Sequence, residues 1–429
     1  MGKIFNETAY FKIRKMIRLV LVLMAVLTGL WIAVAWRGQQ RLKTEMKNFP
    51  TLNPEFYAPK DIHEKEKNMA VWINAGTLTL LLRKDESKVI VDSRTQDYSE
   101  WNSETQRKIA SLLKRNELSF QIASRAAEAN QSTLQLQYRD GWTMRLPDNP
   151  RLIEFLRLSK LLTCKWRYEI AKNMVADAVA TARLQARLAA MLRHEPLEIT
   201  MLCGQHAEKD FHEFLHAAVG KIDYQQLLIL EAETDLLRKL SVSLSRVFEA
   251  EGLAFFKSFA EDPVDDSVWP LADLGSTERR RLLLSHRFNR SGFLADGLNV
   301  FHVLSLKAKE PSANGITEIP NPLMIRVIAP NYEHIIRRVQ VTDAATLLAV
   351  AALRARRQAL STEKYPDTID LPSSPFTGER AIYKKLPDGA VLLAFPESEK
   401  MWKETLQKDW SGLPPRLSWN LPASQAIDK

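Results

Sequence analysis

The five residues from His212 to His216, HEFLH, have the types and the spacing of a zinc-binding helix. In the H-E-x-x-H pattern two imidazoles lie one helical turn apart and can share a zinc ion, while the glutamate can activate a bound water. The next predicted helix could bring Glu231 level with His212 as a third metal ligand. On this hypothesis the chain is a zinc-dependent metallopeptidase with Glu213 as the general base.

The surrounding pattern favours another interpretation, in which HEFLH belongs to an ordinary helix surface. At about 100° per residue the apolar side chains form one stripe, which consists of Phe211, Phe214, Leu215 and Ala218. The two histidines fall outside this stripe, beside Gln205 and Lys209, and are predicted to face solvent. No strand that could hold an extended peptide is predicted near them. We therefore predict no catalytic residue, metal ligand or cofactor, and keep zinc bound by His212, His216 and Glu231 as the alternative.

A predicted block of helices, residues 150–262, carries these candidate residues. Its helices are expected at 151–171, 175–193, 197–219, 224–238 and 239–260. Pro196 suits a first turn, Gly220 suits a helix end, and Asp223 suits an N-cap. Because the links are short, neighbouring helices should be antiparallel, which predicts a solenoid-like block of helical hairpins. The fold class is therefore mainly α.

Small α+β elements are predicted before this block, in residues 69–149. Residues 71–82 and 88–92 are expected to be short strands or buried apolar segments, which their periodicity does not distinguish, and the alternation around Asp140-Gly141 predicts a β-hairpin at 133–146. Between them, a capping box of Ser103 and Gln106 should begin a helical hairpin that breaks at Asn116.

Further small elements are predicted after the block. Residues 263–341 are expected to be a loop-rich connector with one helix near 277–306. In residues 342–429, Thr342-Asp343 should cap a strong helix, and short strands should follow it. Pro387-Asp388-Gly389 indicates a turn between two of these strands, because glycine readily adopts a positive φ.

Three arginines near the end of that last helix allow two interpretations. Arg354, Arg356 and Arg357 could bind phosphate or acidic lipid, or they could simply complement the negative end of the helix dipole. The aromatic set of Trp269, Phe288, Phe293 and Phe301 is predicted to be core rather than a binding groove.

An uncharged apolar run from Leu19 to Trp36 is long enough to span a bilayer as a helix. Residues 1–36 are therefore predicted to be a cytoplasmic tail and a transmembrane anchor, followed by an extended stalk at 37–68 that contains three prolines. Basic residues flank the run on both sides and favour a cytoplasmic N-terminus only narrowly. The expected protein is a single-pass inner-membrane protein with its bulk outside the cytoplasm. Cleavage near Ala35, which would release it, is the alternative.

The charge of the chain favours a membrane partner over nucleic acid. The net charge is +9, but 60 basic residues are interspersed with 51 acidic ones instead of forming a basic face. Partners are therefore expected to be the membrane and unidentified envelope proteins. Cys164 and Cys203 lack C-x-x-C spacing, and the sequence leaves open whether they form a disulfide or two buried thiols.

Two resemblances extend this interpretation. Residues 343–395, a helix followed by K-Y-P-x-x-I, P-F-T-G and D-G-x-x-L-L, are similar to the C-terminal globular module of type II secretion pseudopilins. Lys364 and Ser374 depart from that pattern, so only the fold is implied, and calcium binding is not carried over. The order of features over residues 104–395 resembles a loose class of bacterial single-pass envelope proteins, which implies no particular activity. The predicted function is a non-catalytic scaffold or interaction protein of the envelope, with a zinc metallopeptidase or a component of a secretion or pilus-like assembly as alternatives.

Overall fold

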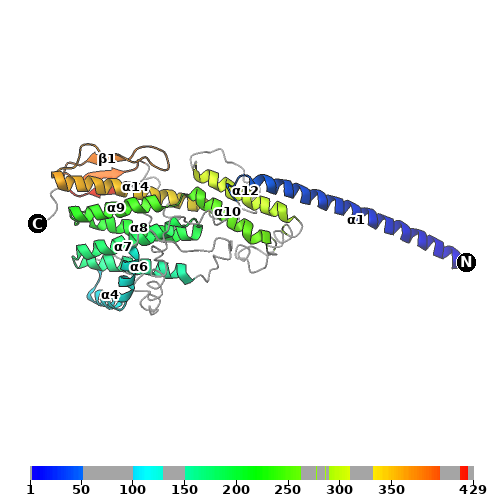
Figure 1. The fold of residues 1–429 in the computed structure, drawn as a ribbon, viewed down its shortest axis with the longest axis horizontal. Coiled ribbons are helices and arrows are strands. Elements are labelled where there is room, and N and C mark those ends of the chain that lie inside the picture. The colour runs from blue at the N-terminus through cyan, green and yellow to red at the C-terminus, as the bar shows by residue number, and fades with distance from the viewer. Residues whose placement is uncertain are drawn as a thin grey trace.

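The computed structural model describes residues 2–51, 100–128, 150–261, 289–309, 332–396 and 416–423, and the single positions 277 and 286. This described part is mainly α-helical with one small sheet and a long apolar N-terminal helix, so the predicted fold class is confirmed. Figure 1 shows an elongated helical body from which the N-terminal helix projects. The strands or buried apolar segments predicted at 71–82 and 88–92 and the β-hairpin predicted at 133–146 lie outside the described residues.

The projecting helix α1 spans Gly2–Met46 and contains a stretch that is long and apolar enough to cross a membrane. It does not stop at Trp36. Its last turns pack against α12, Arg290–Lys309, so residues 37–46 belong to a helix on the body and not to the predicted stalk. The prolines that indicated an extended segment begin only at Pro50, beyond the end of the helix.

Four helices form a layered block: α6 (Pro150–Ala171), α7 (Val175–His194), α8 (Glu198–Ala218) and α9 (Tyr224–Leu240). Their bounds agree closely with the predicted ranges. Asp223 caps α9 as expected, because its carboxylate accepts from Gln226 N at 2.8 Å. The next helix, α10 (Leu244–Glu261), leaves this block and packs mainly on α12.

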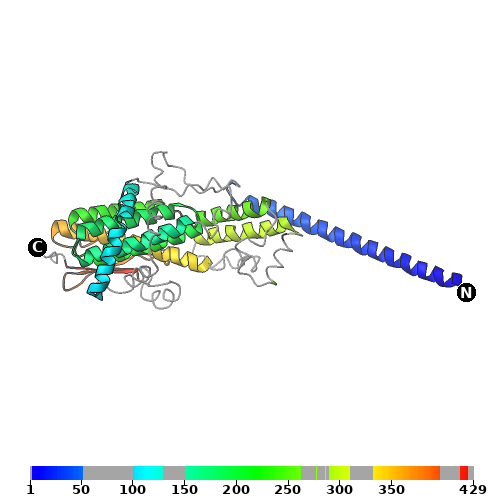
Figure 2. The same ribbon diagram turned by 90° about the horizontal axis from the view of Figure 1, so that it is seen from below.

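The helices α4 (Ser103–Arg115) and α5 (Glu117–Ala127) differ from the predicted hairpin. Asn116 lies between them at φ −99° and ψ 13°, close to helical geometry, and its N–H still bonds to Leu112 O. The chain therefore bends without reversing, and Figure 2 shows the two helices following one another across the block. The N-cap of α4 is also one residue earlier than predicted. The side chain of Asn102 accepts from Thr105 N, while the side chain of Gln106 donates to the carbonyl of Trp101.

Helix α12 begins later than the predicted helix at 277–306. Asn289 is not helical, and its side chain accepts from Gly292 N at 3.1 Å. Thr277 and His286, the described positions before it, are helical, so the predicted helix is interrupted at Asn289, which caps the start of α12.

The long helix α14 spans Tyr332–Thr362 and begins ten residues before the predicted Thr342-Asp343 cap. Inside a helix these residues are satisfied differently: Thr342 donates to Arg338 O, and Asp343 binds Arg193 of α7. The predicted boundary between 341 and 342 therefore falls within a helix.

A three-stranded antiparallel sheet covers α14, with β1 (Ile382–Lys385), β2 (Val391–Ala394) and β3 (Ser418–Leu421) in that order. Tyr383 pairs with Leu393, and Leu393 with Trp419. The predicted turn is confirmed, because Gly389 has φ +80° and Leu386 N donates to Ala390 O. Strand β2 is buried against the helices while β1 is largely exposed.

Two hydrophobic cores stabilise the body. The larger core contains side chains from helices α4 through α9, from the second half of α14 and from the sheet. The smaller one joins α10, α12, the start of α14 and the end of α1. Phe293 and Phe301 lie in the smaller core with Phe255 and Phe259, so these two predictions of core positions are confirmed. Trp269 and Phe288 lie outside the described residues.

Candidate functional site

Helix α8, which carries HEFLH, lies in the interior of the block and contacts α6, α7 and α14. The predicted stripe that includes Phe211 and Leu215 is fully buried, as expected. The opposite side is buried as well: His212 is 2% exposed, Gln205 0% and Lys209 8%. The prediction that this face meets solvent was wrong. A helical projection assumes one buried face, whereas α8 has neighbours on several sides.

The ring of His212 takes part in a buried chain of hydrogen bonds between α8 and α14. Its Nε2 lies 3.0 Å from Thr346 Oγ1, and the Thr346 hydroxyl donates to Glu208. Because the Thr346 hydroxyl donates its single proton to the carboxylate, the Thr346 oxygen accepts from His212 Nε2–H. Nδ1 has no hydrogen-bond partner in the structure.

The same carboxylate binds Arg193, which joins three helices. Arg193 on α7 donates through Nη1 to Glu208 on α8 and through Nη2 to Asp343 on α14 at 2.7 Å. Burial would raise the pKa of Glu208, but the positive charge of Arg193 and the hydrogen bonds from His212 and Thr346 outweigh burial and hold that pKa below its usual value. Glu208 is therefore a buried carboxylate anion held by Arg193 and Thr346.

A glycine makes room for this network. A methyl group at Gly204 would lie 2.6 Å from Arg193 Cγ and 3.1 Å from the Arg193 backbone nitrogen. Such distances are shorter than carbon contacts allow, so α7 and α8 approach closely only because position 204 has no side chain.

The ring of His216 contacts the sheet. Its ring stacks on Trp419 of β3, with 3.8 Å between centroids and 26° between planes. Burial, with smaller contributions from Arg416 and His212, lowers the pKa of His216 to about 3. The ring is therefore neutral at physiological pH and links the sheet to α8.

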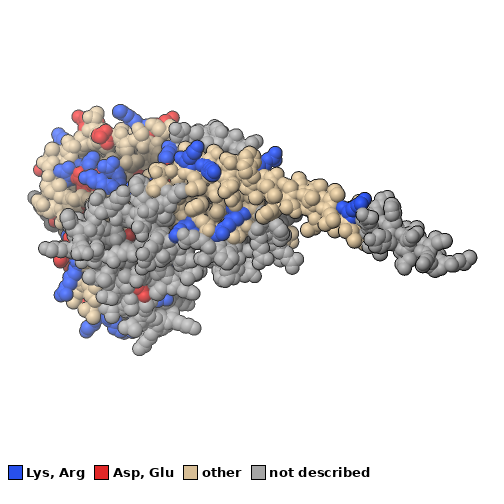
Figure 3. Space-filling view, turned by 45° about the vertical axis from the view of Figure 1, so that its right-hand side comes forward, with Lys and Arg blue, Asp and Glu red and all other residues tan. Residues whose placement is uncertain are grey.

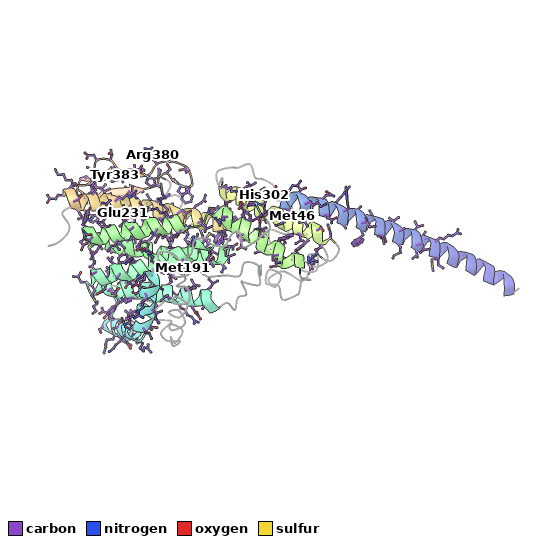
Figure 4. The ribbon with its side chains drawn as sticks, in the orientation of Figure 1. Met46, Met191, Glu231, His302, Arg380 and Tyr383 are labelled. Carbon is purple, nitrogen blue, oxygen red and sulfur yellow. The ribbon has the colours of Figure 1, made fainter. Side chains whose placement is uncertain are left out.

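The two glutamates of the zinc hypothesis are engaged in ion pairs. Glu213 binds Arg167 of α6 at 2.9 Å and Lys209 at 3.2 Å. Glu231 binds Arg354 and Arg357 of α14 at 2.9 and 2.8 Å, and Figure 4 shows it on the side of α9 that faces α14. The sequence interpretations of these two arginines as lipid ligands or as dipole partners missed this pairing between helices.

The structure therefore gives each residue of the alternative zinc site a separate structural partner. Over residues 2–51, 100–128, 150–261, 289–309, 332–396 and 416–423, no group of three or more His, Cys, Asp or Glu side chains is arranged to hold a metal ion. Sequence reasoning also missed Arg193, Thr346 and Trp419, because each gains its role from a contact far away along the chain.

The two cysteines do not form a disulfide in the structure. Cys164 and Cys203 are both buried, and burial raises the pKa of Cys203 to about 11. Of the two possibilities that the sequence left open, the structure has the buried thiols.

The second candidate site is the junction of the apolar helix with the body. A methyl group at Gly38 would lie 2.3 Å from Asn289 Oδ1 and 2.8 Å from Gly292 N, so α1 and α12 touch here. Further along, Arg41 binds Asp296, and Glu45 accepts from Asn299 at 3.1 Å. Figure 4 shows Met46 and His302 where the two helices meet.

The junction ends in the smaller core. Phe49 is 6% exposed and packs in this core, with its ring centroid 6.4 Å from that of His302. The last turns of α1 are thus fixed to α12 by a close helix contact, by polar bonds and by a buried aromatic ring.

No protein-family model matches this chain, and comparisons with curated proteins and with solved structures found no match. The resemblances to the pseudopilin module and to the envelope-protein class therefore stay predictions.

Proposed function

We propose that this chain is a single-pass membrane protein whose helical body acts outside the cytoplasm as a non-catalytic scaffold or interaction protein of the bacterial envelope. The observation that carries the proposal is the continuity of α1. One helix provides both the exposed apolar segment and the contacts that attach it to the body.

The exposed apolar surface of α1 supports the membrane attachment. Leu19, Leu23, Leu27 and Trp31 are all more than half exposed, and none of the apolar window is buried in the body. Figure 3 shows the described part of this projection as almost uncharged, with lysine and arginine side chains on the adjoining body. Such a surface is stable in a lipid core and costly in water.

The engagement of the HEFLH residues supports a structural role for α8. His212 and His216 hold α14 and β3, and Glu213 holds α6. These contacts provide a reason for the residue types in HEFLH that does not require a metal. They favour a scaffold over the zinc-hydrolase alternative.

The orientation can be tested by labelling a single exposed cysteine from outside the cell. Lys239 is exposed on α9, and the two native thiols are buried, so Lys239→Cys adds one accessible thiol. We expect a membrane-impermeant maleimide to label this variant in intact spheroplasts. Labelling only after lysis would place the body in the cytoplasm and overturn the orientation, and the parent chain controls for reaction of the native thiols.

The scaffold role can be tested with a photo-crosslinking residue at exposed positions. Leu228 and Ile229 of α9 are 36% and 43% exposed, while Leu227 and Leu230 beside them are buried. The scaffold role is supported if the crosslinking residue at Leu228 or Ile229 captures one defined partner and the same residue at the buried position Leu227 does not. A zinc-dependent peptidase activity of the purified full chain would instead overturn the non-catalytic assignment.

A further inference from the structure

Two helices of the body end at the level where the apolar run of α1 ends. Gly38, two residues after Trp36, lies against the start of α12, because a methyl group there would be 2.8 Å from Gly292 N. From this point α1 and α12 run in the same direction, since the next contact joins Arg41 to Asp296. Figure 1 shows α10 and α12 at the end of the body from which α1 projects.

The last turn of α10 reaches the same level, because Arg290 joins it to α12. The guanidinium donates through Nε to Phe259 O at 3.1 Å and through Nη2 to Ala260 O. Both carbonyls belong to a helix C-terminus, where the partial charge of the backbone is negative. Residues 257–260 of α10 and 289–292 of α12 together form a surface that we name the proximal end of the body.

The helical rise gives the depth of the proximal end. Trp36 and Gly38 are about 3 Å apart along the axis of α1, at about 1.5 Å per residue. A bilayer has about 5–7 Å of headgroups on each side of its hydrocarbon core. If the run from Leu19 to Trp36 crosses this core, as proposed above, the proximal end lies among the headgroups.

An exposed tryptophan agrees with this depth. Trp36 is the last residue of the apolar run, and it is 60% exposed. Tryptophan is enriched where a bilayer meets water, because its ring is apolar while its N–H group is polar. The side chain of Trp36 therefore suits the boundary between hydrocarbon and headgroups.

Two exposed arginines lie at this level, Arg37 on α1 and Arg290 on α12. Neither forms an ion pair with another described residue, and the bonds of Arg290 go to neutral carbonyl oxygens. Arginine remains protonated in proteins and binds phosphate through its planar fork of N–H groups. Two uncompensated positive charges at headgroup depth match the phosphates of acidic lipids.

We propose that the proximal end of the body binds the headgroups of anionic phospholipids through Arg37 and Arg290. The proposal rests on the membrane attachment of α1 proposed above, but it does not depend on the side of the membrane. Lipid is favoured over free phosphate because Arg37 directly continues the apolar run of α1. The body then lies on the membrane surface and is not held away from it.

The test measures lipid binding to the full chain in detergent by native mass spectrometry. Phosphatidylglycerol should bind the parent chain more tightly than phosphatidylcholine with the same acyl chains. Arg37→Gln and Arg290→Gln should each weaken the binding of phosphatidylglycerol by about fivefold and leave that of phosphatidylcholine unchanged. Arg290→Lys keeps the positive charge and should keep the preference.

Lys47→Gln is the matched control. Lys47 is also an exposed basic residue of α1, but it lies about 16 Å beyond Trp36 along the helix, outside the headgroups. Its substitution should leave the lipid preference unchanged. If Arg290→Gln fails to fold, Arg37→Gln decides, because the Arg37 side chain holds no other described residue.

The proposal is overturned if the parent chain binds both lipids equally, or if Lys47→Gln loses the preference as strongly as Arg37→Gln does. Displacement of phosphatidylglycerol by the same concentration of inorganic phosphate would reveal a site for free phosphate and would overturn it too. A failure of the membrane attachment itself is distinguishable, because the chain would then stay in solution without detergent. A chain that needs detergent but shows no lipid preference contradicts only the present inference.

Discussion

His212 and His216 are one helical turn apart, but the structure gives them different surroundings. His212 donates to Thr346 inside the body, and His216 stacks on Trp419 of the sheet. A histidine pair on one helix can share a metal only when both rings turn a nitrogen toward the same point. In this chain the two rings connect α8 to two different elements.

The buried ring of His216 should make the protein sensitive to acid. Its folded-state pKa of about 3 lies below the value of about 6.5 in the unfolded chain, so the unfolded state binds the proton more readily. Stability is therefore fully present above pH 6.5 and is lost as pH falls toward 3. From about pH 7 to pH 5 we expect a loss of roughly 2 kcal/mol from this group, measured by denaturant unfolding of the full chain in detergent.

The matched variant is His216→Phe, which keeps an aromatic ring against Trp419 but cannot titrate. Its free energy of unfolding should fall less over the same pH range, by the amount assigned to His216. An equal fall in both proteins would show that this histidine does not cause the acid sensitivity.

A second residue-scale prediction concerns metal. We expect the full chain, purified without chelator, to contain no stoichiometric zinc, because His212 and His216 already have structural partners. His212→Ala should nevertheless destabilise the protein by about 1–3 kcal/mol, since it leaves the buried Thr346 hydroxyl without its donor. The loss should be the same with and without EDTA, whereas zinc near one equivalent that disappears in the variant would restore the metallopeptidase hypothesis.

At the scale of elements, the contact with α12 fixes the end of the long apolar helix α1 to the body. Two glycines, Gly38 and Gly292, lie where the helices approach, and polar bonds from Arg41 and Glu45 continue the contact. If α1 crosses a membrane as proposed, a helix fixed in this way holds the body in one orientation relative to that membrane. An extended stalk of the predicted kind would leave that orientation free.

This contact predicts different effects for the same substitution at two glycines of α1. Gly38→Ala would place a methyl group 2.8 Å from the backbone nitrogen of Gly292, so the helices must separate, at a cost of about 1–3 kcal/mol. Gly29→Ala meets no atom within 4 Å and should leave stability unchanged. Thermal unfolding in detergent checks both, and an unchanged midpoint for Gly38→Ala would argue against the close contact.

On the scale of the whole molecule, the two cores are linked by α14, which contributes to both, and by α8, whose Met201 lies in the smaller core. The smaller core combines residues that are far apart in the sequence, because Phe49 packs there with α10 and α12. The attachment of α1 is thus part of the folding of the body. The apolar segment of α1 itself contributes no buried surface to it.

Two truncations should separate these contributions. A chain that begins at residue 37 keeps Gly38, Arg41 and Phe49 and should unfold cooperatively near the midpoint of the full chain. A chain that begins at residue 50 loses the buried Phe49 ring and the α12 contacts and should be less stable by more than about 3 kcal/mol. Calorimetry on both decides, and equal midpoints would return residues 37–49 to the role of a stalk.

The sequence by itself determined the features that depend on local patterns. The apolar run from Leu19 to Trp36 predicted the exposed helix, and periodicity predicted α6 to α9 almost to their ends. Asp223 and the turn at Gly389 followed from capping and from positive φ. These signals are local because a few neighbouring side chains decide them through backbone hydrogen bonds and steric limits.

Only the tertiary structure decided which polar side chains meet. The sequence could not show that Asp343 binds Arg193, 150 residues away, so it was predicted to be a cap. It could not show that α8 is covered on several sides, so His212 was predicted to face solvent. Charged and polar side chains gain their partners from packing between helices. The periodicity of one helix does not predict which other helices will pack against it.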